Sequence, residues 1–376
     1  MRWENYFLKS ETDFDPFWRR YLASERNVLF ILGVGFDPRT TNGIGHLYNM
    51  EGPGLRDTWL LRYFQNEEDK KSHTPPEVAD NLSIIHSLLE DKGFPKAEVK
   101  GIVLRSPEDI SQASIQASGL IQTVEQIAAF SDIVVDISAM PRGIFIPLIN
   151  KLLHLVDDFN EESDTKKNLH VIATENPLLD AKIEDQGTDE TATYIYGFRV
   201  KEIGKTEDHK QVWIPILGEN QFEQFKKIKS ELTPSDTSPV LPFPSEDLRR
   251  GDDLIFKFQS LLFNDSDFET KNIIYTDEAN PFQTYRLLNE TIERYVRSFA
   301  LLGGCKVVVS ALSSKLLTIG TFMAVYEKRK EGHNVGIMHV ESLGHRLNGS
   351  YQQAKKEIDK HNKLYEIWLA GDPYFA

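Results

Sequence analysis

Short apolar runs alternate with helical patterns along most of the chain. The run "VLFILGV" at residues 28–34 is apolar at six of its seven positions, which predicts a strand buried on both faces. Similar runs predict strands at 101–105, 132–137, 169–174, 211–217, 239–242, 272–276, 306–310 and 335–340. The patterns between them predict helices at 77–92, 108–130, 143–157, 220–231, 246–263, 281–301, 314–330 and 350–364. This alternation is typical of βαβ units around mainly parallel sheets.

The length of the chain, 376 residues, exceeds what one hydrophobic core usually organises. Three pairs of strand-end segments match between the two halves in the same order. They are 28–33 with 213–218, 136–143 with 308–315, and 171–176 with 337–342. The sequence thus predicts an α/β protein of two similar Rossmann-like halves, each a mainly parallel sheet flanked by helices. The three matches indicate an internal duplication. The alternative is convergence, because any two buried strands have similar apolar sequences.

The expected division is an N-terminal aromatic segment at 1–26, a first Rossmann-like domain at 27–200 and a second at 201–376. The aromatic side chains of the first segment either cover the protein's own core or dock on a partner, and the first is the commoner arrangement. They are Trp3, Tyr6, Phe7, Phe14, Phe17 and Trp18.

Composition narrows the possible partners. Acidic residues outnumber basic ones by 57 to 43, for a net charge of -14, and no stripe of lysine and arginine follows one face. This argues against duplex nucleic acid and leaves a small anionic ligand at a local basic pocket. The single cysteine, Cys305, excludes an internal disulfide and a zinc site built from cysteines. With neither a signal peptide nor an apolar span, the chain is expected to be cytoplasmic, with no membrane partner.

Loops after the predicted strands are the expected ligand sites, because open α/β sheets bind ligands beyond the carboxyl ends of their strands. In "GVGFDPR" (33–39), Pro38 occupies the position of the third glycine of a dinucleotide fingerprint, so a standard NAD or FAD site is disfavoured. Gly33 and Gly35 allow close approach of the backbone, while Asp37 can accept hydroxyl protons and Arg39 can clamp a phosphate. The alternative is that Asp37 and Arg39 pair and hold the loop in shape.

Two matched loops each lead into a predicted helix. "SAMPRG" offers Ser138, Arg142 and Gly143, and "SALSSK" offers Ser313, Ser314 and Lys315. Unpaired N–H groups and the helix dipole attract anions to such a place, and a basic side chain adds to the attraction. The alternative is that the serines are ordinary helix caps and the basic residues are solvated.

Acid/base chemistry has three candidates, namely Asp37, Asp277 and Glu278. The last two stand in "TDEANP", where Asn280 can simply cap the following helix. The mixed cluster at 242–253 favours an internal salt-bridge network or an interface. No nucleophile elbow, Walker lysine or close histidine pair is present, so no metal site is expected. His46 and Glu51 lie near enough to the first loop to reach its ligand.

The motifs GVGFDPR, SAMPRG and SALSSK resemble those of an uncharacterised bacterial family of defence islands. The two α/β halves also resemble the tandem Rossmann-like proteins of anti-phage defence, whose duplicated CARF-type and SAVED-type domains bind cyclic nucleotide signals. The resemblance extends over 27–344 and implies a nucleotide ligand. No appended nuclease, TIR or membrane effector is visible in the sequence, so the resemblance also implies that this chain needs a separate effector protein or is itself an accessory subunit. The chain is expected to form an oligomer.

Three functions follow as hypotheses. The first is a sensor or accessory subunit that binds a nucleotide or another phosphorylated ligand. The second is an enzyme that hydrolyses or cleaves a nucleotide. The third is a structural subunit of a larger complex. The same loops serve binding and turnover, so the sequence leaves the choice between the first two open.

Overall fold

The computed structural model of the protein describes residues 1–201, 210–263 and 268–374. It divides into two compact units. The first unit comprises Asn5–Glu184 and His345–Ala376, and the second comprises Met1–Glu4 and Asp185–Gly344. The sequence predicted three consecutive segments, 1–26, 27–200 and 201–376. In the structure, residues 345–376 instead belong to the first unit, and residues 1–4 belong to the second.

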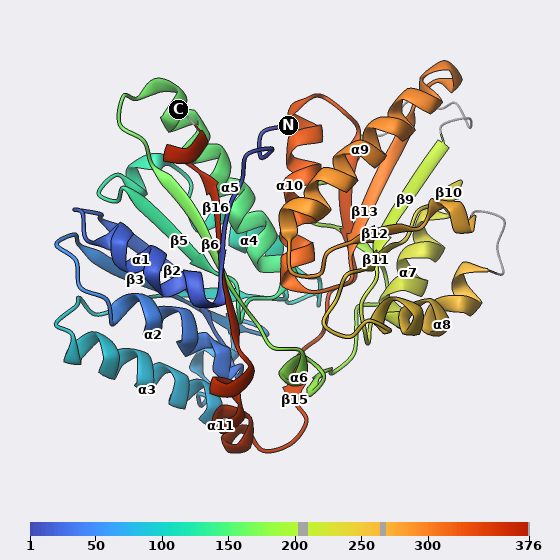
Figure 1. Ribbon diagram of the computed structural model, residues 1–376. Coiled ribbons are helices and arrows are strands. Elements are labelled where there is room, and N and C mark those ends of the chain that lie inside the picture. Colours follow the sequence, from blue (N-terminus) through green and yellow to red (C-terminus); the bar gives the residue numbers. More distant parts are fainter. Residues whose placement is uncertain (202–209, 264–267, 375–376) are drawn as a thin grey trace. The chain divides into compact units, whose positions relative to one another are not determined.

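The first sheet has seven strands in the order β1-β16-β6-β5-β2-β3-β4 (Figure 1). Five of them, from β6 to β4 in this order, are parallel. Strand β16 pairs with β6 in antiparallel orientation, and β1 pairs with β16, again antiparallel. The strands are β1 (Phe7–Ser10), β2 (Val28–Val34), β3 (Arg56–Phe64), β4 (Glu98–Val103), β5 (Asp132–Asp136), β6 (Asn168–Glu175) and β16 (Lys363–Ala370). All seven residues of β2 are buried, as its apolar run predicts.

The second sheet runs in the order β12-β11-β9-β13-β14-β8, and β10 also pairs with β9. All its pairings are parallel except that of β8 with β14. The strands are β8 (Thr193–Tyr194), β9 (Lys210–Ile216), β10 (Asp236–Thr237), β11 (Val240–Pro242), β12 (Ile274–Thr276), β13 (Cys305–Ala311) and β14 (Val335–His339). Two short strands, β7 (Ile183–Asp185) and β15 (His345–Leu347), form a separate pair where the chain passes between the units.

Both sheets arrange their five main parallel strands in the same way. Numbered along the chain, the order is third, second, first, fourth, fifth in each sheet, which is the order of the Rossmann fold. The predicted α/β class with two Rossmann-like halves is therefore confirmed. The three matched sequence pairs fall on β2 and β9, β5 and β13, and β6 and β14, which are the first, fourth and fifth strands of their sheets. Equivalent positions in the fold support the internal duplication.

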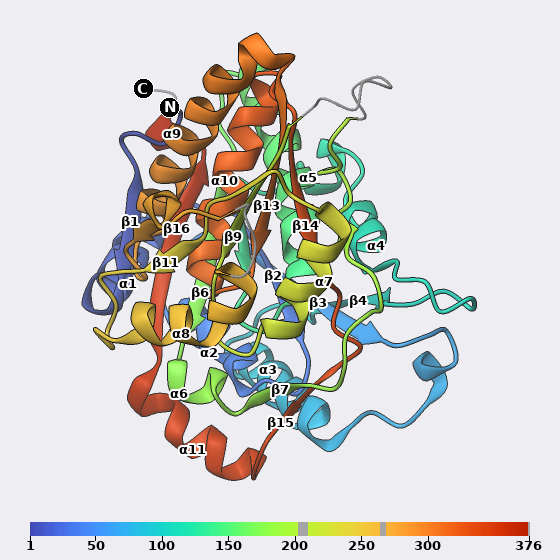
Figure 2. The ribbon, with the colours of Figure 1, turned by 90° about the vertical axis from the view of Figure 1, so that its right-hand side faces the viewer.

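Helices cover both faces of each sheet, as Figures 1 and 2 show. In the first unit α1, α2 and α3 lie on one face and α4 and α5 on the other; in the second, α7 and α8 lie opposite α9 and α10. The helices of the first unit are α1 (Phe14–Leu22), α2 (Asn42–Tyr48), α3 (Pro76–Asp91), α4 (Ala113–Gly119), α5 (Arg142–Glu162), α6 (Pro177–Asp180) and α11 (Tyr351–His361). Those of the second are α7 (Phe222–Leu232), α8 (Arg250–Leu262), α9 (Pro281–Phe299) and α10 (Lys315–Lys330).

Short 3-10 helices connect several of these elements. They are η1 (Glu11–Asp13), η2 (Pro38–Thr41), η3 (Asp69–Lys71), η4 (Val124–Ile127), η5 (Thr270–Asn272), η6 (Ala300–Leu302) and η7 (Asp372–Tyr374). The helix expected at 108–130 is in fact α4 followed by η4, because Thr123 adopts an extended backbone and begins a new turn with a capping box. Among the described residues, no helix combines the length and apolar character that crossing a bilayer requires.

The N-terminal aromatic side chains cover the protein's own core, as the commoner alternative predicts. Phe14, Phe17 and Trp18 are buried in the first unit, and Tyr6 is 41% exposed. Trp3 is buried in the second unit, where its ring meets that of Tyr285 edge to face at 5.3 Å. The N-terminal segment is thus part of both cores.

Candidate ligand-binding loops

The topological switch point of each sheet lies between its first and fourth strands, which are β2 and β5 in the first unit and β9 and β13 in the second. Chain connections leave these neighbouring strands toward opposite faces, so ligands of open α/β proteins bind beyond their carboxyl ends. The loops GVGFDPR and SAMPRG follow β2 and β5, and SALSSK follows β13. The predicted motifs therefore stand at the two switch points.

Gly33 brings the end of β2 directly against the SAMPRG loop. A Cβ atom at this position would lie 2.1 Å from the Tyr63 hydroxyl and 2.9 Å from Cγ of Met140, so any larger residue would have to displace these side chains. That hydroxyl is buried and has no hydrogen-bond partner among the described residues. Burial raises the pKa of Tyr63, and the Asp136 carboxylate raises it further. Gly35 differs from Gly33 in this respect, because a Cβ at Gly35 would meet no atom within 4 Å.

Asp37 and Arg39 hold this loop in shape, which is the alternative that the sequence left open. Asp37 accepts a hydrogen bond from the backbone N–H of Arg39 at 2.9 Å, and its Oδ2 accepts another from Nη2 at 2.7 Å. Arg39 is only 2% exposed, and its Nη1 also pairs with Asp180 at 2.8 Å. Burial lowers the pKa of Arg39, but the two carboxylates outweigh burial and raise it. The guanidinium therefore has two internal carboxylate partners.

Asn81 on α3 fixes the same loop from the other side. Its amide donates to the carbonyl oxygens of Gly35 at 2.9 Å and Asp37 at 3.1 Å. Tyr351 on α11 in turn donates to the Asn81 carbonyl at 2.8 Å. The loop is thus preorganised by residues far apart in the sequence, which no local pattern indicates.

In SAMPRG, Ser138 links strand ends. Its backbone N–H donates to Asp136 at 2.9 Å, and its hydroxyl oxygen accepts from the N–H of Thr174 at the end of β6. Arg142 is half-buried and begins α5, and Gly143 follows it. Pro141 occupies the cap position, where no side-chain hydrogen bond covers the first N–H groups of this helix of 21 residues.

In SALSSK, Ser314 caps α10 by accepting from the N–H of Leu317 at 3.3 Å, and the half-buried Lys315 begins the helix. Ser313 is 5% exposed. Gly218, just after β9, has the role that Gly33 has in the first unit. A Cβ there would lie 2.3 Å from the carbonyl oxygen of Leu312. Sequence reasoning did not select Gly218, although the matched pair 28–33 with 213–218 aligns it with Gly33.

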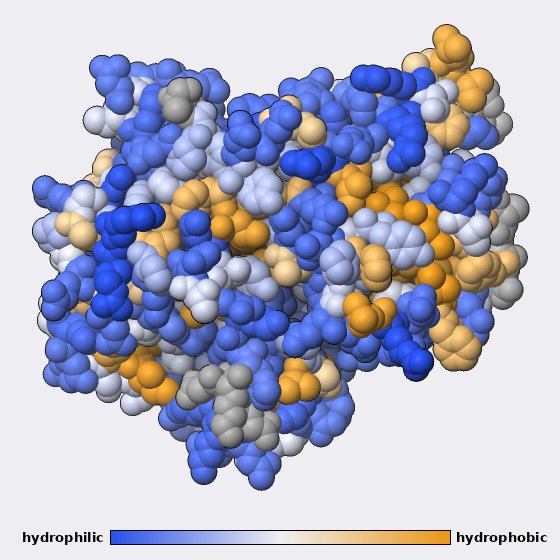
Figure 3. Space-filling view, viewed as in Figure 1, coloured by the Kyte–Doolittle hydropathy of each residue, from blue (hydrophilic) through white to orange (hydrophobic). Residues whose placement is uncertain are grey.

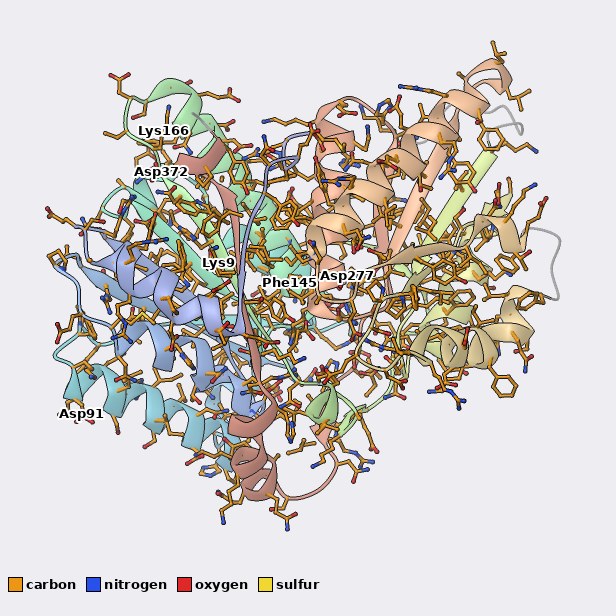
Figure 4. The ribbon with its side chains drawn as sticks, in the orientation of Figure 1. Lys9, Asp91, Phe145, Lys166, Asp277 and Asp372 are labelled. Carbon is orange, nitrogen blue, oxygen red and sulfur yellow. The ribbon has the colours of Figure 1, made fainter. Side chains whose placement is uncertain are left out.

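The carboxylates of TDEANP are occupied by structural contacts. Asp277, labelled in Figure 4 between β12 and α9, accepts from the N–H of Ala279 at 2.8 Å. Glu278 forms an ion pair with Arg250, which also pairs with Glu219 at 2.7 Å. Burial lowers the pKa of Arg250, but the carboxylates of Glu219 and Glu278 outweigh burial and raise it. The cluster at 242–253 therefore contributes to an internal salt-bridge network.

Asn280 caps α9. Its side-chain oxygen accepts from the N–H groups of Phe282 at 3.0 Å and Gln283 at 3.3 Å, which confirms the capping alternative. We expect Asn280→Ala to lower the free energy of unfolding of the second unit by about 1 kcal/mol. Asn280→Asp, which keeps the accepting oxygen, is the control and should unfold close to wild type. Urea denaturation measures both, and an unchanged stability of Asn280→Ala would contradict the capping role.

The part of the chain that the structure describes holds one group with the spacing of metal ligands, formed by Glu293, Glu331 and His333. Lys328 lies within it, with Nζ 3.2 Å from Glu293 and 2.7 Å from Glu331. These carboxylates therefore serve as partners of a lysine.

No family model matches this chain, and no curated protein matches it. Among solved structures it is similar to a type III CRISPR defence DNA nuclease activated by cyclic oligoadenylate. That likeness has 7% identity and a TM-score of 0.45, and covers 79% of this chain and 63% of the other, so less than two thirds of the nuclease is spanned. A universal stress protein from Archaeoglobus fulgidus DSM 4304 gives 9% identity, coverage of 82% and 94%, and a TM-score of 0.22. At these TM-scores the likenesses add nothing to the assignment from strand order.

Proposed function

We propose that this chain binds a nucleotide or another small phosphorylated ligand at its switch-point loops, as a sensor or accessory subunit of bacterial anti-phage defence. One observation carries the proposal. At both switch points a glycine lies at the end of the first strand, in close contact with the loop that follows the fourth strand. That loop leads into a long helix, and the first residue of the helix is basic. The pairs are Gly33 with Arg142 and Gly218 with Lys315.

This arrangement suits a phosphate for physical reasons. The first N–H groups of a helix have no partner within the helix, and the helix dipole adds partial positive charge to them. A basic side chain in the first turn strengthens that field, while the strand-end glycine lets its strand and the helix-starting loop pack closely at the switch point. The resemblance of the two α/β halves to cyclic-nucleotide sensors favours nucleotides among phosphorylated ligands.

Binding is favoured over turnover because two of the three acid/base candidates have structural ion pairs. Asp37 pairs with Arg39 and Glu278 pairs with Arg250. Asp277 accepts one backbone N–H through Oδ1 and keeps its second oxygen, so it is the candidate left for turnover. The buried N-terminal aromatic rings also remove the observation that favoured a structural subunit.

Isothermal titration calorimetry with nucleoside phosphates and cyclic oligonucleotides tests the proposal. We expect Arg142→Ala or Lys315→Ala to weaken binding by about tenfold or more, since each removes a charge-assisted hydrogen bond. Lys151→Ala and Lys330→Ala remove a charge farther along α5 and α10 and should leave affinity unchanged. A panel in which nothing binds, or in which both site variants bind as tightly as wild type, would sink the proposal.

A further inference from the structure

We propose a second binding site on the first unit, for a small molecule that carries a phosphate group. A cavity of about 410 Å³ lies there, with walls from α1, η2, α2 and α11. Its size falls in the range of about 300–1,000 Å³ that is typical of small-molecule sites. Gly33, Arg142, Gly218 and Lys315, on which the proposed function rests, do not line it. His46, which the sequence places within reach of the first loop's ligand, does line it, so the two sites are distinguished by their own variants.

Basic side chains from three elements converge on this cavity. Arg19 comes from α1, His46 from α2 and Lys355 from α11. Arg19 is exposed and forms no ion pair with any residue that the structure describes. Lys355 pairs with Asp80 at 2.5 Å, which uses one of the three donors of its ammonium group and leaves two for a ligand. On a chain of net charge -14, such a convergence is local and favours an anion.

His46 is held in place for a ligand. Its Nδ1 lies 2.8 Å from Oδ1 of Asp15, and its ring meets Phe14 edge to face. Because an ionised carboxylate only accepts hydrogen bonds, Nδ1 carries the hydrogen and Nε2 is the ring nitrogen left for a ligand. Among the residues whose side chains the structure describes, Asp15 is the one acidic residue in the cavity wall, and it pairs with His46. Figure 3 shows that the surface over α1 and α2 is mostly hydrophilic, as a site for a polar ligand should be.

The glycines of α2 give an independent indication. This helix has only seven residues, and each glycine costs it about 1 kcal/mol relative to alanine. Gly43 is required by packing, since a Cβ there would lie 2.3 Å from Oδ2 of Asp136. At Gly45 a Cβ would meet no atom within 4 Å, and the backbone conformation is one that any residue adopts. Gly45 lines the cavity, so the missing side chain keeps its wall open.

Isothermal titration calorimetry of the full chain tests this site, with inorganic phosphate and ribose 5-phosphate as probes and unphosphorylated ribose as the ligand control. We expect both phosphates to bind and ribose not to. Arg19→Gln should weaken the binding of ribose 5-phosphate by about tenfold or more. Gly45→Leu should abolish binding, because its side chain extends into the cavity, and it should keep the fold, because a Cβ at this position meets no atom within 4 Å.

Matched controls come from the next residue on each helix. Arg20→Gln and Lys356→Gln remove exposed charges that do not line the cavity and should bind like wild type. The proposal is overturned if neither phosphate binds, or if binding survives both Arg19→Gln and Gly45→Leu. Binding that Arg142→Ala weakens and Arg19→Gln does not would place the phosphate at the switch point, which overturns the second site while supporting the proposed function.

Discussion

Replacing Arg39 with methionine is expected to lower the free energy of unfolding of the first unit by about 3–5 kcal/mol. The guanidinium is 2% exposed and bonds both oxygens of Asp37, whose side chain is itself buried. Methionine fills much of the same volume but leaves the Asp37 carboxylate without a counter-charge. Urea denaturation followed by hydrogen exchange of the β2 amides measures the loss in the first unit.

Asp180→Asn is the control for the Arg39 prediction. Asp180 pairs with the same guanidinium, but its side chain is 46% exposed, so the cost should stay within about 1 kcal/mol. The opposite outcome for Arg39→Met, wild-type stability with lost ligand affinity, would restore Arg39 as the phosphate clamp that the sequence first suggested.

Stability of the first unit is expected to fall as pH rises from about 6.5 to above 9, by up to roughly 3 kcal/mol. The cause is His170 on β6, which is fully buried with Nδ1 2.7 Å from Glu366 and Nε2 3.5 Å from Asp132. Burial lowers the pKa of His170, but the two carboxylates outweigh burial and raise it to about 9. The folded chain therefore binds this proton more tightly than the unfolded chain, whose histidine titrates near 6.5.

The sign of this pH effect follows from the shift. The stabilisation is complete at pH values below the pKa of His170 in the unfolded chain, and it is lost as pH rises through the pKa of His170 in the folded chain. Glu366 acts in the same direction because burial raises its pKa, with His170 opposing. Urea denaturation at several pH values measures the slope. The double variant His170→Asn/Glu366→Gln should remove the slope whatever its stability, and the exposed His154→Asn should keep it. A flat profile for the wild-type protein would contradict the charged state of His170.

The same buried pair explains a strand that sequence reasoning missed. In "KLYEIWLA", Glu366 interrupts the apolar run of β16, so the pattern indicated only a helix that ended at 364. Strand β3 of the same sheet was missed for a similar reason, since Arg56 begins the strand and is buried where it donates to the carbonyls of Leu47 and Met50. Strand β2, which contains no charged residue, was predicted to the residue. Charge neutralised by tertiary partners is invisible to periodicity.

The candidate site was predictable in location but not in role. Parallel strand order places loops at one edge of a sheet, so the motifs at Gly33, Arg142 and Lys315 could be selected from the sequence alone. Arg39 can bind either a ligand or the Asp37 carboxylate. The sequence is the same in both cases, so only the geometry of the side chains shows the contact with Asp37. The cavity between α1 and α11 joins Arg19 to Lys355, which are too far apart in the chain for any motif to connect them.

Native mass spectrometry of the full chain, as purified and after mixing with nucleotides and cyclic oligonucleotides, tests the proposed binding function most directly. The predicted result is an added mass equal to an intact ligand, which is recovered unchanged and which the double variant Arg142→Ala/Lys315→Ala no longer retains. Two results would contradict the account. One is the absence of any ligand mass, and the other is release of a cleaved nucleotide that Asp37→Asn or Asp277→Asn abolishes.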